Sequence, residues 1–350
     1  MTEPLLSARD IVQEFVVRER GGARGGVVQA VSGVSFDVLP GETLGIVGET
    51  GSGKSTLARA ILQAPRPKSG HVAFRGAELT KLRGAKLLQA RRHMQFVFQD
   101  PFGSLDPKWQ VRSIVEEPLA AYHAGRKQAR RHRVEELLDL VGLDPARYAR
   151  RHPRELSGGQ AQRVAIARAV ALNPSLLICD EAVSSLDVLI QAQVLNLFEK
   201  LRAELGLSYL FIAHDLALVK QVSDRVAVMY MGRLCEVGPG ESVYKHPLHP
   251  YTKALLDAIP STEPGAARAS ATIKGEPPSP VSPPSGCRFR TRCPRAADIC
   301  AAEEPAMREL GSGHAVACHF PLEATENTGC VPAARGEQAG AATGSTTRSG

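Results

Sequence analysis

The sequence contains no apolar run of the roughly 18 to 20 residues that a helix needs to cross a bilayer. We therefore expect that the chain does not cross a membrane by itself. Its first twenty residues interleave charged side chains with short apolar pieces, so they contain no continuous signal-peptide core. A cytoplasmic location is the resulting expectation.

Aromatic residues are also scarce, at 5% of 350 residues, whereas the formal net charge is +7. Arginines cluster in residues 83–92, 126–133 and 147–154. A platform for nucleic-acid bases needs aromatic rings among its basic side chains, and rings are too sparse in these clusters to build one. Solvated helix faces and loops explain the arginines, so we expect no nucleic-acid partner.

The remaining composition is ordinary, with 43% hydrophobic and 23% charged residues. This balance is typical of a globular protein with a substantial core. The length allows two domains, or one large domain with an appendage.

A glycine-rich turn follows an apolar run at residues 43–47 and leads into a segment with helical character at 57–62. It reads Gly48-Glu49-Thr50-Gly51-Ser52-Gly53-Lys54-Ser55-Thr56. Backbone N–H groups at such a strand–turn–helix junction point into one concavity, where anions bind. The Lys54 ammonium can reach the β- and γ-phosphates, and the Ser55 hydroxyl can ligate Mg²⁺. The turn predicts a site for a nucleoside triphosphate.

Three other segments with strand character end at polar side chains: Gln99, the pair Asp180 and Glu181, and His214. The carboxyl edge of a parallel sheet is where α/β proteins bind ligands. Adjacent residues on a strand face opposite ways, so Asp180 can face Mg²⁺ while Glu181 faces a water beyond the γ-phosphate. His214 is placed to contact the γ-phosphate.

A second anion-binding turn, Leu156-Ser157-Gly158-Gly159-Gln160, precedes a predicted helix at 161–172. The region before it, about residues 101–165, has apolar residues at helical spacing. We expect it to form a small helical subdomain inserted between Gln99 and the second turn.

In order and spacing these motifs resemble the ATP-binding cassette (ABC) ATPases over roughly residues 5–325. The Leu-Ser-Gly-Gly-Gln stretch separates that family from other P-loop enzymes, including small-molecule kinases. A narrower resemblance is to the F-type ATP-binding subunit of oligopeptide, dipeptide and nickel importers. It rests on Phe98–Pro101, Cys179–Glu181 with Ser184–Gln193, and His249–Leu256.

The resemblance implies an α/β fold with a RecA-like core, an N-terminal antiparallel β subdomain, the inserted helical subdomain and a small cysteine-containing C-terminal extension. We expect a nucleotide-binding domain at residues 1–260 and the extension at 261–325. A disordered tail is expected at 326–350.

The resemblance also implies a role for each matching residue. Ser55 would bind Mg²⁺, Asp180 would bind it through water, and Gln99 would sense Mg²⁺ and the attacking water while contacting the membrane subunit. Glu181 would be the general base, and His214 would hold the γ-phosphate. The other nucleotide contacts are Phe15 on adenine, Gly48–Thr56 on the phosphates, Ser157, Gly158, Gly159 and Gln160 on the ATP of an opposing subunit, and Asp187 at the interface. Ala182 departs from the pattern, because these subunits usually have proline there.

The implied function is ATP hydrolysis coupled to uptake of oligopeptides, dipeptides or a related solute. The implied partners are a homologous second ATPase subunit in a heterodimer, two polytopic permease subunits and, indirectly, an extracytoplasmic solute-binding protein. The chain would be peripheral, on the cytoplasmic face of the cell membrane. The alternative is a soluble ABC ATPase acting on nucleic acid in repair or translation. It is disfavoured because the chain has one cassette and no long coiled-coil insertion.

Five of the seven cysteines follow residue 286, after a Pro-, Ser-, Gly- and Ala-rich segment. Cys287, Cys293, Cys300 and Cys318 are spaced C-x5-C-x6-C-x17-C. In a cytosolic segment such a group favours metal binding over disulfides, and the spacing does not match zinc knuckles. Thiolate ligands alone suit an iron–sulfur centre, and the resemblance implies a [4Fe-4S] cluster here. We expect that cluster, with zinc or free thiols as alternatives.

Overall fold

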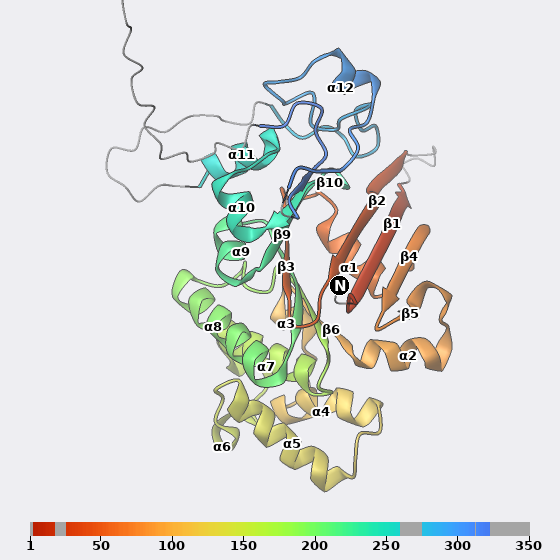
Figure 1. The fold of residues 1–350 in the computed structure, drawn as a ribbon. Helices are drawn as coiled ribbons and strands as arrows, with labels where there is room; N and C mark the ends of the chain where they lie inside the picture. Colours follow the sequence, from red (N-terminus) through yellow and green to blue (C-terminus); the bar gives the residue numbers. More distant parts are fainter. Residues whose placement is uncertain (1–2, 18–25, 260–274, 312, 323–350) are drawn as a thin grey trace, which may run out of the picture.

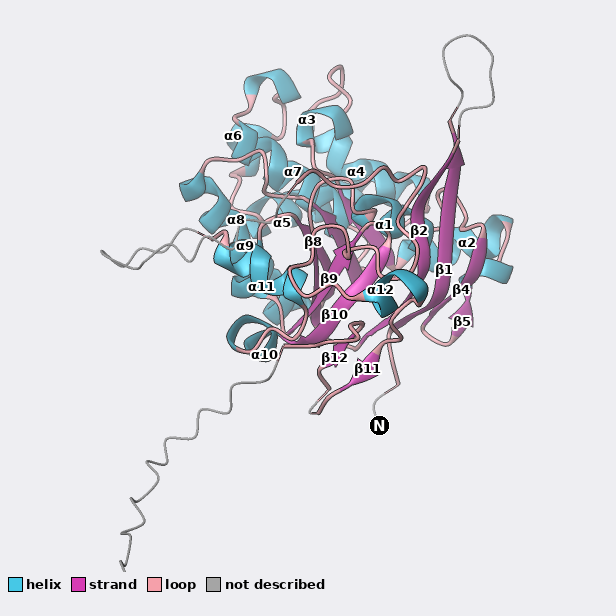
Figure 2. Ribbon diagram, turned by 90° about the horizontal axis from the view of Figure 1, so that it is seen from above, coloured by secondary structure: helices cyan, strands magenta, loops and turns pink. Residues whose placement is uncertain are grey.

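The computed structural model describes residues 3–17, 26–259, 275–311 and 313–322, and the structural statements below concern these ranges. Two sheets form the centre of the molecule, and helices surround the larger one (Figures 1 and 2). The helical subdomain and the C-terminal extension lie at opposite ends (Figure 1). The predicted boundary at residue 260 and the predicted tail at 326–350 lie outside the described residues.

The smaller sheet is antiparallel, with the strand order β2-β1-β4-β5. One continuous strand, β2, covers residues 27–38. It pairs with β1 throughout and accommodates Gly33 as a bulge, because Ile11 pairs with Val34 and Val12 with Ser32. The strands are β1 (Leu6–Val16), β2 (Val27–Val38), β4 (Ser69–Phe74) and β5 (Ala77–Glu78).

The larger sheet has the order β11-β12-β10-β9-β3-β8-β7-β6. Its five strands from β9 to β6 run parallel. All residues of β3, β7 and β8 are buried, which is why these segments are almost continuously apolar. The parallel strands are β3 (Thr43–Val47), β6 (Met94–Val97), β7 (Leu176–Asp180), β8 (Ser208–Ala213) and β9 (Arg225–Tyr230).

The C-terminal extension continues this larger sheet. Strand β10 (Arg233–Pro239) pairs antiparallel with β9, and β12 (Ala315–Val316) and β11 (Arg308–Glu309) follow at the edge. No local sequence pattern predicts these three short strands. The extension is therefore joined to the nucleotide-binding core by backbone hydrogen bonds.

Helices α3 to α6 lie in the region where we predicted a helical subdomain, and α4 and α5 pack on α7. Helix α8 (Val188–Leu205) ends at Gly206, which adopts the left-handed conformation that favours glycine. The helices are α1 (Lys54–Ile61), α2 (Gly84–Arg92), α3 (Pro101–Ser104), α4 (Val111–Ala121), α5 (Lys127–Leu140), α6 (Pro145–Tyr148), α7 (Gly158–Val170), α8 (Val188–Leu205), α9 (Leu216–Val222), α10 (Gly240–Lys245), α11 (Pro250–Asp257) and α12 (Asp298–Ala302), with 3₁₀ turns at Leu79–Lys81 and Pro153–Glu155.

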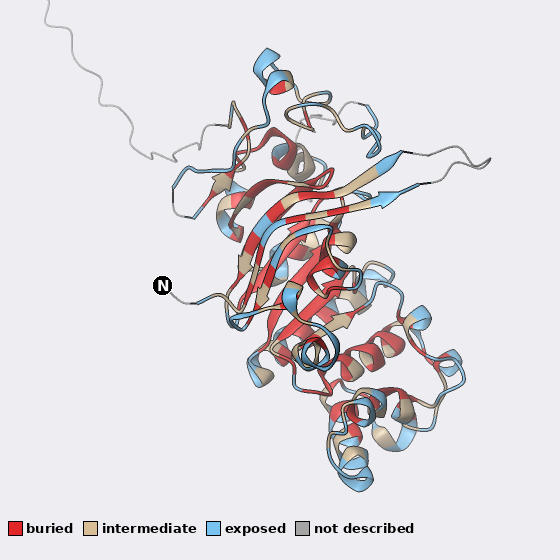
Figure 3. Cartoon of the chain, turned by 90° about the vertical axis from the view of Figure 1, so that its right-hand side faces the viewer, coloured by how far each residue is buried: buried red, intermediate tan, exposed pale blue. Residues whose placement is uncertain are grey.

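The parallel strands separate two hydrophobic clusters, and the buried residues follow the strands through the molecule (Figure 3). In β7, Leu176 and Ile178 join the cluster that includes the antiparallel sheet, whereas Leu177 and Cys179 join the cluster that includes α7 and α8. This alternation fixes the direction of the residues that follow the strand. The arrangement confirms the expected α/β fold. Within the described ranges, no helix has both the length and the apolar character needed to cross a bilayer.

Candidate active site

The glycine-rich turn connects β3 to α1, as predicted. Gly53 caps α1 with a φ of 101°, and a Cβ atom there would lie 2.0 Å from the carbonyl oxygen of Ala30. At Gly48 a Cβ atom would lie 2.0 Å from the carbonyl oxygen of Met229. Only glycine fits these two positions without displacing backbone. The turn is thus packed tightly between β2 and β9.

Lys54 is 3% exposed, and its ammonium is held inside the turn. Its Nζ donates hydrogen bonds to the carbonyl oxygens of Gly48, at 2.7 Å, and Glu49, at 3.0 Å. Burial lowers the pKa of Lys54, against the opposing effects of Glu181 and Asp180. The cation therefore lies in a site where acids from another strand already favour its charge.

Ser55 and Asp180 form the oxygen-rich part of the site. The Ser55 hydroxyl donates to Asp180 Oδ1 at 2.7 Å, and Asp180 is 4% exposed. Burial raises the pKa of Asp180, while this hydrogen bond lowers it. A hydroxyl and a carboxylate side by side are ligands that suit Mg²⁺, so these residues fit the ion that we expected here.

Glu181, Gln99 and His214 meet at the adjacent position. Gln99 Nε2 donates to Glu181 Oε2 at 2.8 Å, and His214 Nδ1 lies 3.7 Å from the same oxygen. Glu181 has a φ of 49°, which is uncommon for a residue with a side chain and is concentrated at functional sites. The structure thus brings together side chains from the ends of β6, β7 and β8, as predicted.

The backbone around Glu181 is fixed on both sides. Its N–H donates to the carbonyl of Ile212 on β8 at 2.9 Å, and its carbonyl accepts from the N–H of Ser184 at 3.1 Å. Ala182, which stands where proline is usual, is 1% exposed. These contacts hold the loop without the rigidity of a proline ring.

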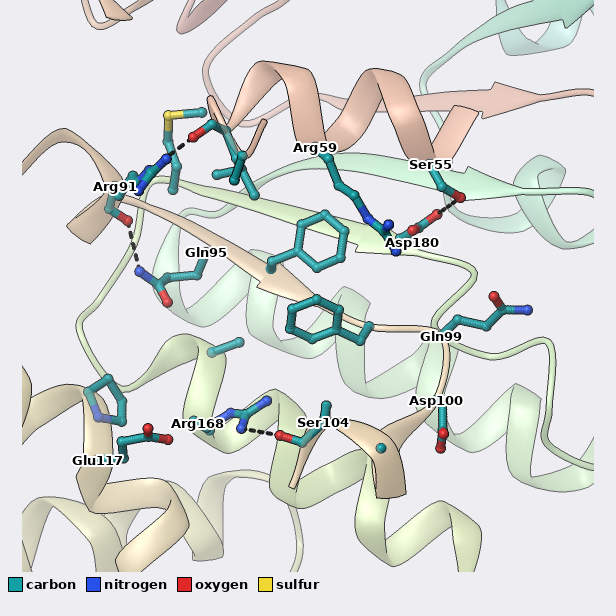
Figure 4. Close-up of a pocket in the computed structure, with 18 of the residues that line it drawn as sticks. Ser55, Arg59, Arg91, Gln95, Gln99, Asp100, Ser104, Glu117, Arg168 and Asp180 are labelled. Carbon is teal, nitrogen blue, oxygen red and sulfur yellow. Dashed lines mark hydrogen bonds between the residues drawn. The ribbon is translucent and has the colours of Figure 1, made fainter. Parts of the chain in front are cut away.

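A cavity of about 940 Å³ opens beside this cluster (Figure 4). It extends from Ser55 and Asp180 past Gln99 to Glu117 of α4 and Arg168 of α7. The cavity is therefore bounded by the glycine-rich turn and helix α1 on one side and by the helical subdomain on the other.

The second glycine turn lies next to the start of α8. Ser157 and Gln160 form a reciprocal capping box at the start of α7. A Cβ atom on Gly159 would lie 2.5 Å from Ile190, whose N–H donates to Asp187 at 3.0 Å. In the described part of the chain, no hydrogen bond or ion pair joins this group to residues 48–56. The predicted site residues therefore form two separate groups.

Phe15 belongs to neither group by direct contact. Its ring is 41% exposed on β1, and it pairs with Val28 of β2. Ala30 follows Val28 by two residues on β2, and its carbonyl lies against Gly53. The strand pairing places Phe15 near the turn, and adenine stacking stays a prediction.

The predicted [4Fe-4S] cluster is wrong. In the described ranges, no group of three or more His, Cys, Asp and Glu side chains is arranged to hold a metal ion. Cys287, Cys293, Cys300 and Cys318 are free thiols. Burial raises the pKa of Cys287 to about 11 and also raises the pKa of Cys293 and Cys318. Thiols that remain protonated are poor metal ligands, and these side chains pack as small apolar groups.

Glu49 in the glycine-rich turn makes contacts with distant residues that the sequence did not predict. Arg292 of the extension forms two hydrogen bonds with the Glu49 carboxylate, at 2.8 and 3.1 Å. The Glu49 N–H donates to the Tyr251 hydroxyl at 2.9 Å. Arg292 and Glu49 are 243 positions apart, and no local pattern signals such a pair.

The fold and this geometry define a P-loop nucleoside triphosphatase core. Comparison with known proteins makes the assignment more specific. A family model described as "ABC transporter" matches residues 31–184, and one described as "Oligopeptide/dipeptide transporter, C-terminal region" matches residues 235–300.

Curated relatives extend the match over nearly the whole chain. The chain is 48% identical to the oligopeptide transport ATP-binding protein AppF of Bacillus subtilis (strain 168), over 91% of this chain and 98% of that protein. It is 47% identical to the probable peptide ABC transporter ATP-binding protein y4tS of Sinorhizobium fredii (strain NBRC 101917 / NGR234), over 91% of this chain and 90% of that protein.

A solved structure agrees. The ATP-binding cassette MJ0796, a dimer in a post-hydrolysis state bound to ADP and Pi, has a TM-score of 0.60 and 29% identity, covering 67% of this chain and 98% of that one. The chain belongs to the ATP-binding proteins of ABC transporters, in the group with the oligopeptide/dipeptide transporter C-terminal region. It is an ATP-hydrolysing enzyme.

Proposed function

We propose that this chain is the ATPase subunit that powers import of oligopeptides, dipeptides or a related solute. The observation that carries the proposal is its 48% identity to the oligopeptide transport protein AppF over 91% of the chain, because the match includes the C-terminal extension as well as the cassette. The curated relatives described above are named for peptide transport. This favours transport over an ABC ATPase acting on nucleic acid.

In this proposal residues 48–56 bind the phosphates, with Lys54 at the β- and γ-phosphates. Ser55 and Asp180 would hold Mg²⁺, with Gln99 near it, and the bound ion would supply positive charge to offset the charge of the phosphates. The Ser55–Asp180 distance of 2.7 Å supports this pairing.

Glu181 acts as general base on the attacking water. Its carboxylate accepts from Gln99 and lies 3.7 Å from His214, so both neighbours restrict its orientation. His214 is the proposed γ-phosphate contact. A base fixed in this way takes a proton from water without first rearranging its own hydrogen bonds.

The second group, Ser157 to Gln160 with Asp187, acts on ATP held by a second ATPase subunit. Its separation from residues 48–56 supports this arrangement. Val188 and Leu189, directly after Asp187, are each 78% exposed and offer an apolar contact surface. We assign the partner as a homologous subunit in a heterodimer, and Phe15 as the adenine contact.

The remaining partners are two polytopic permease subunits and, indirectly, an extracytoplasmic solute-binding protein. A permease contact at Gln99 would reach Glu181 through the hydrogen bond described above. In this proposal the chain is a peripheral subunit on the cytoplasmic face of the cell membrane. We divide it into a nucleotide-binding domain at residues 1–260, an extension at 261–325 and a tail at 326–350.

Co-purification tests the proposal. The full chain, tagged and gently solubilised from its native host, should carry polytopic membrane proteins and a second ATPase, identified by mass spectrometry. Deleting its gene should abolish uptake of labelled peptides, and wild-type protein but not the Glu181→Gln variant should restore it. Salt-sensitive binding to nucleic acid with no membrane partner would instead support the alternative.

A further inference from the structure

The Glu49 side chain projects from the phosphate-binding turn toward the C-terminal extension. Its two carboxylate oxygens accept from the two terminal nitrogens of Arg292, at 2.8 and 3.1 Å. Two parallel bonds of this kind fix the position and orientation of both groups. The extension therefore contacts the turn through a geometrically specific ion pair.

This pair is shielded from water. The Arg292 side chain is 7% exposed and that of Glu49 is 26% exposed. Arg292 also lies 3.3 Å from the Tyr230 hydroxyl. Salt screens such a pair much less than it screens pairs on the surface.

A cluster of buried aromatic rings lies behind the pair. Tyr230 of β9, Tyr251 of α11 and Phe289 of the extension are nearly fully buried and pack with ring centroids 4.7 to 5.3 Å apart. The Tyr251 hydroxyl accepts from the Glu49 N–H. Both the side chain and the backbone N–H of Glu49 are therefore held by parts of the chain outside the phosphate-binding turn.

A second arginine of the extension braces the surroundings of the turn. Arg288 donates to the carbonyl of Met231, in the turn after β9, and to Gln29 and Ser32 of β2 at 2.8 and 2.9 Å. The next residue, Gly232, donates its N–H to the carbonyl of Ser52 at 2.8 Å. The extension thus supports the turn from two directions.

The charge of Glu49 makes the ion pair important. A carboxylate in a turn that binds phosphates repels a nucleotide that carries several negative charges. Arg292 supplies a compensating positive charge, and it holds the carboxylate in the direction of the extension. Removing Arg292 would leave an unpaired carboxylate at the phosphate site.

We infer that Arg292 is a positioning residue for ATP binding, and that through Glu49 the C-terminal extension sets the nucleotide affinity of the cassette. The inference rests on the proposed role of residues 48–56 as the phosphate site. It gives the extension a function in the ATPase reaction in addition to any role in transport.

The test measures the dissociation constant and KM for MgATP, and kcat, on the full-length protein. Arg292→Ala should raise the dissociation constant and KM about tenfold, within the usual range of coupling between two sites, and change kcat less than threefold. Adding Glu49→Gln to Arg292→Ala should restore affinity, because it removes the unpaired charge. Glu49→Gln alone leaves the positive charge of Arg292 uncompensated and should therefore lower the dissociation constant for MgATP.

A merely structural role predicts the opposite for the double variant, because removing both partners would not repair a loosened turn. Arg292→Lys keeps the charge and should give intermediate affinity; it also replaces Arg292→Ala in the comparison if the alanine variant does not fold. Arg295→Ala is the matched control, since Arg295 is exposed in the same segment and should leave affinity unchanged.

The Lys54→Met variant distinguishes failure of the proposed phosphate site from failure of the proposed role of Arg292. If it binds MgATP normally, the proposed phosphate site is wrong. If it loses binding while Arg292→Ala binds as the wild type does, the phosphate site stands and the role of Arg292 is contradicted. Failure of Glu49→Gln to restore affinity in the double variant would also contradict the role of Arg292.

Discussion

The side-chain amide of Gln99 donates a hydrogen bond to the Glu181 carboxylate at 2.8 Å, although the two residues are 82 positions apart in the chain. Gln99 lines the cavity between the sheet and the helical subdomain. Glu181 follows the buried strand β7 and faces the proposed position of the reacting water. The bond therefore connects an exposed side chain at the cavity with the proposed general base.

Replacing Glu181 with Gln should abolish this proton transfer while preserving the size of the side chain. We expect ATP hydrolysis to fall about a hundredfold or more, which is typical of losing a general base, with ATP binding retained. Hydrolysis is measured by phosphate release and binding by calorimetry. Glu199→Gln, an exposed position on α8, is the control. Turnover close to normal in Glu181→Gln would contradict the assignment of the base.

Replacing Gln99 with Ala should leave Glu181 without its amide donor. We expect intact ATP binding but loss of most of the stimulation of hydrolysis by the membrane subunits. The ATPase rate is compared with and without the permease in the same detergent. Gln95→Ala is the control, because Gln95 lines the same cavity but donates its hydrogen bond to the Arg91 carbonyl and not to Glu181. This variant should retain the stimulation by the membrane subunits. Equal stimulation in Gln99→Ala and the wild type would refute the coupling.

The Mg²⁺ requirement should depend on Asp180. Asp180→Asn keeps an acceptor for the Ser55 hydroxyl but removes the negative charge that favours a divalent cation. We expect the Mg²⁺ concentration for half-maximal hydrolysis to rise about tenfold or more, since one charged ligand is lost. Asp139→Asn, an aspartate at the exposed end of α5, should have no effect. An unchanged Mg²⁺ titration would show that Asp180 is not a ligand.

The pH dependence of stability should contain a contribution from His249. Burial lowers its pKa from 6.5 to about 4, against the opposing effect of Glu236, which also pairs with His314. The unfolded chain binds the proton more tightly between these two values. His249 therefore contributes stability that is fully present above about pH 6.5 and is lost as the pH falls toward 4, by up to about 3 kcal/mol.

The His249→Asn variant tests this contribution. In the wild type, Nδ1 of His249 caps α11 by accepting from the Tyr251 N–H at 3.0 Å. Asn is a good N-cap and does not titrate, so it should preserve the cap while removing the titration. The free energy of urea unfolding between pH 4 and 7.5 should depend less on pH in this variant. His132→Asn, on an exposed side chain, should match the wild type. Parallel pH profiles for all three proteins would disprove the effect.

Much of the first site group could be predicted from the sequence. Apolar strands that end at Gln99, Asp180 and His214 were expected at the carboxyl edge of a sheet, and the structure joins these ends through Glu181 and Ser55. The signal is local, because each motif contains both the strand and the residue that follows it. The helical subdomain was also predicted from local spacing.

Other features depend on contacts that no local pattern contains. The Arg292–Glu49 pair joins residues 243 positions apart, and strands β11 and β12 are two residues each. The cysteine spacing predicted a metal site, and that prediction is wrong, because no group of three or more His, Cys, Asp and Glu side chains in the described ranges is arranged to hold an ion. Burial of Cys287 and its neighbours keeps the thiols protonated, which the spacing could not reveal.

The division of the site residues into two groups predicts that one chain is incomplete as an ATPase. Residues 48–56 are the proposed ATP site, whereas Ser157 and Gly159 should act on the ATP of a partner subunit. The most direct test is the rate of ATP hydrolysis per chain as the co-purified second ATPase subunit is titrated into this protein. We predict that the hydrolysis rate rises cooperatively with added partner. This rise should be lost when Ser157→Ala and the equivalent substitution in the partner subunit are combined. Full activity from a strict monomer, unchanged by the partner, would contradict it.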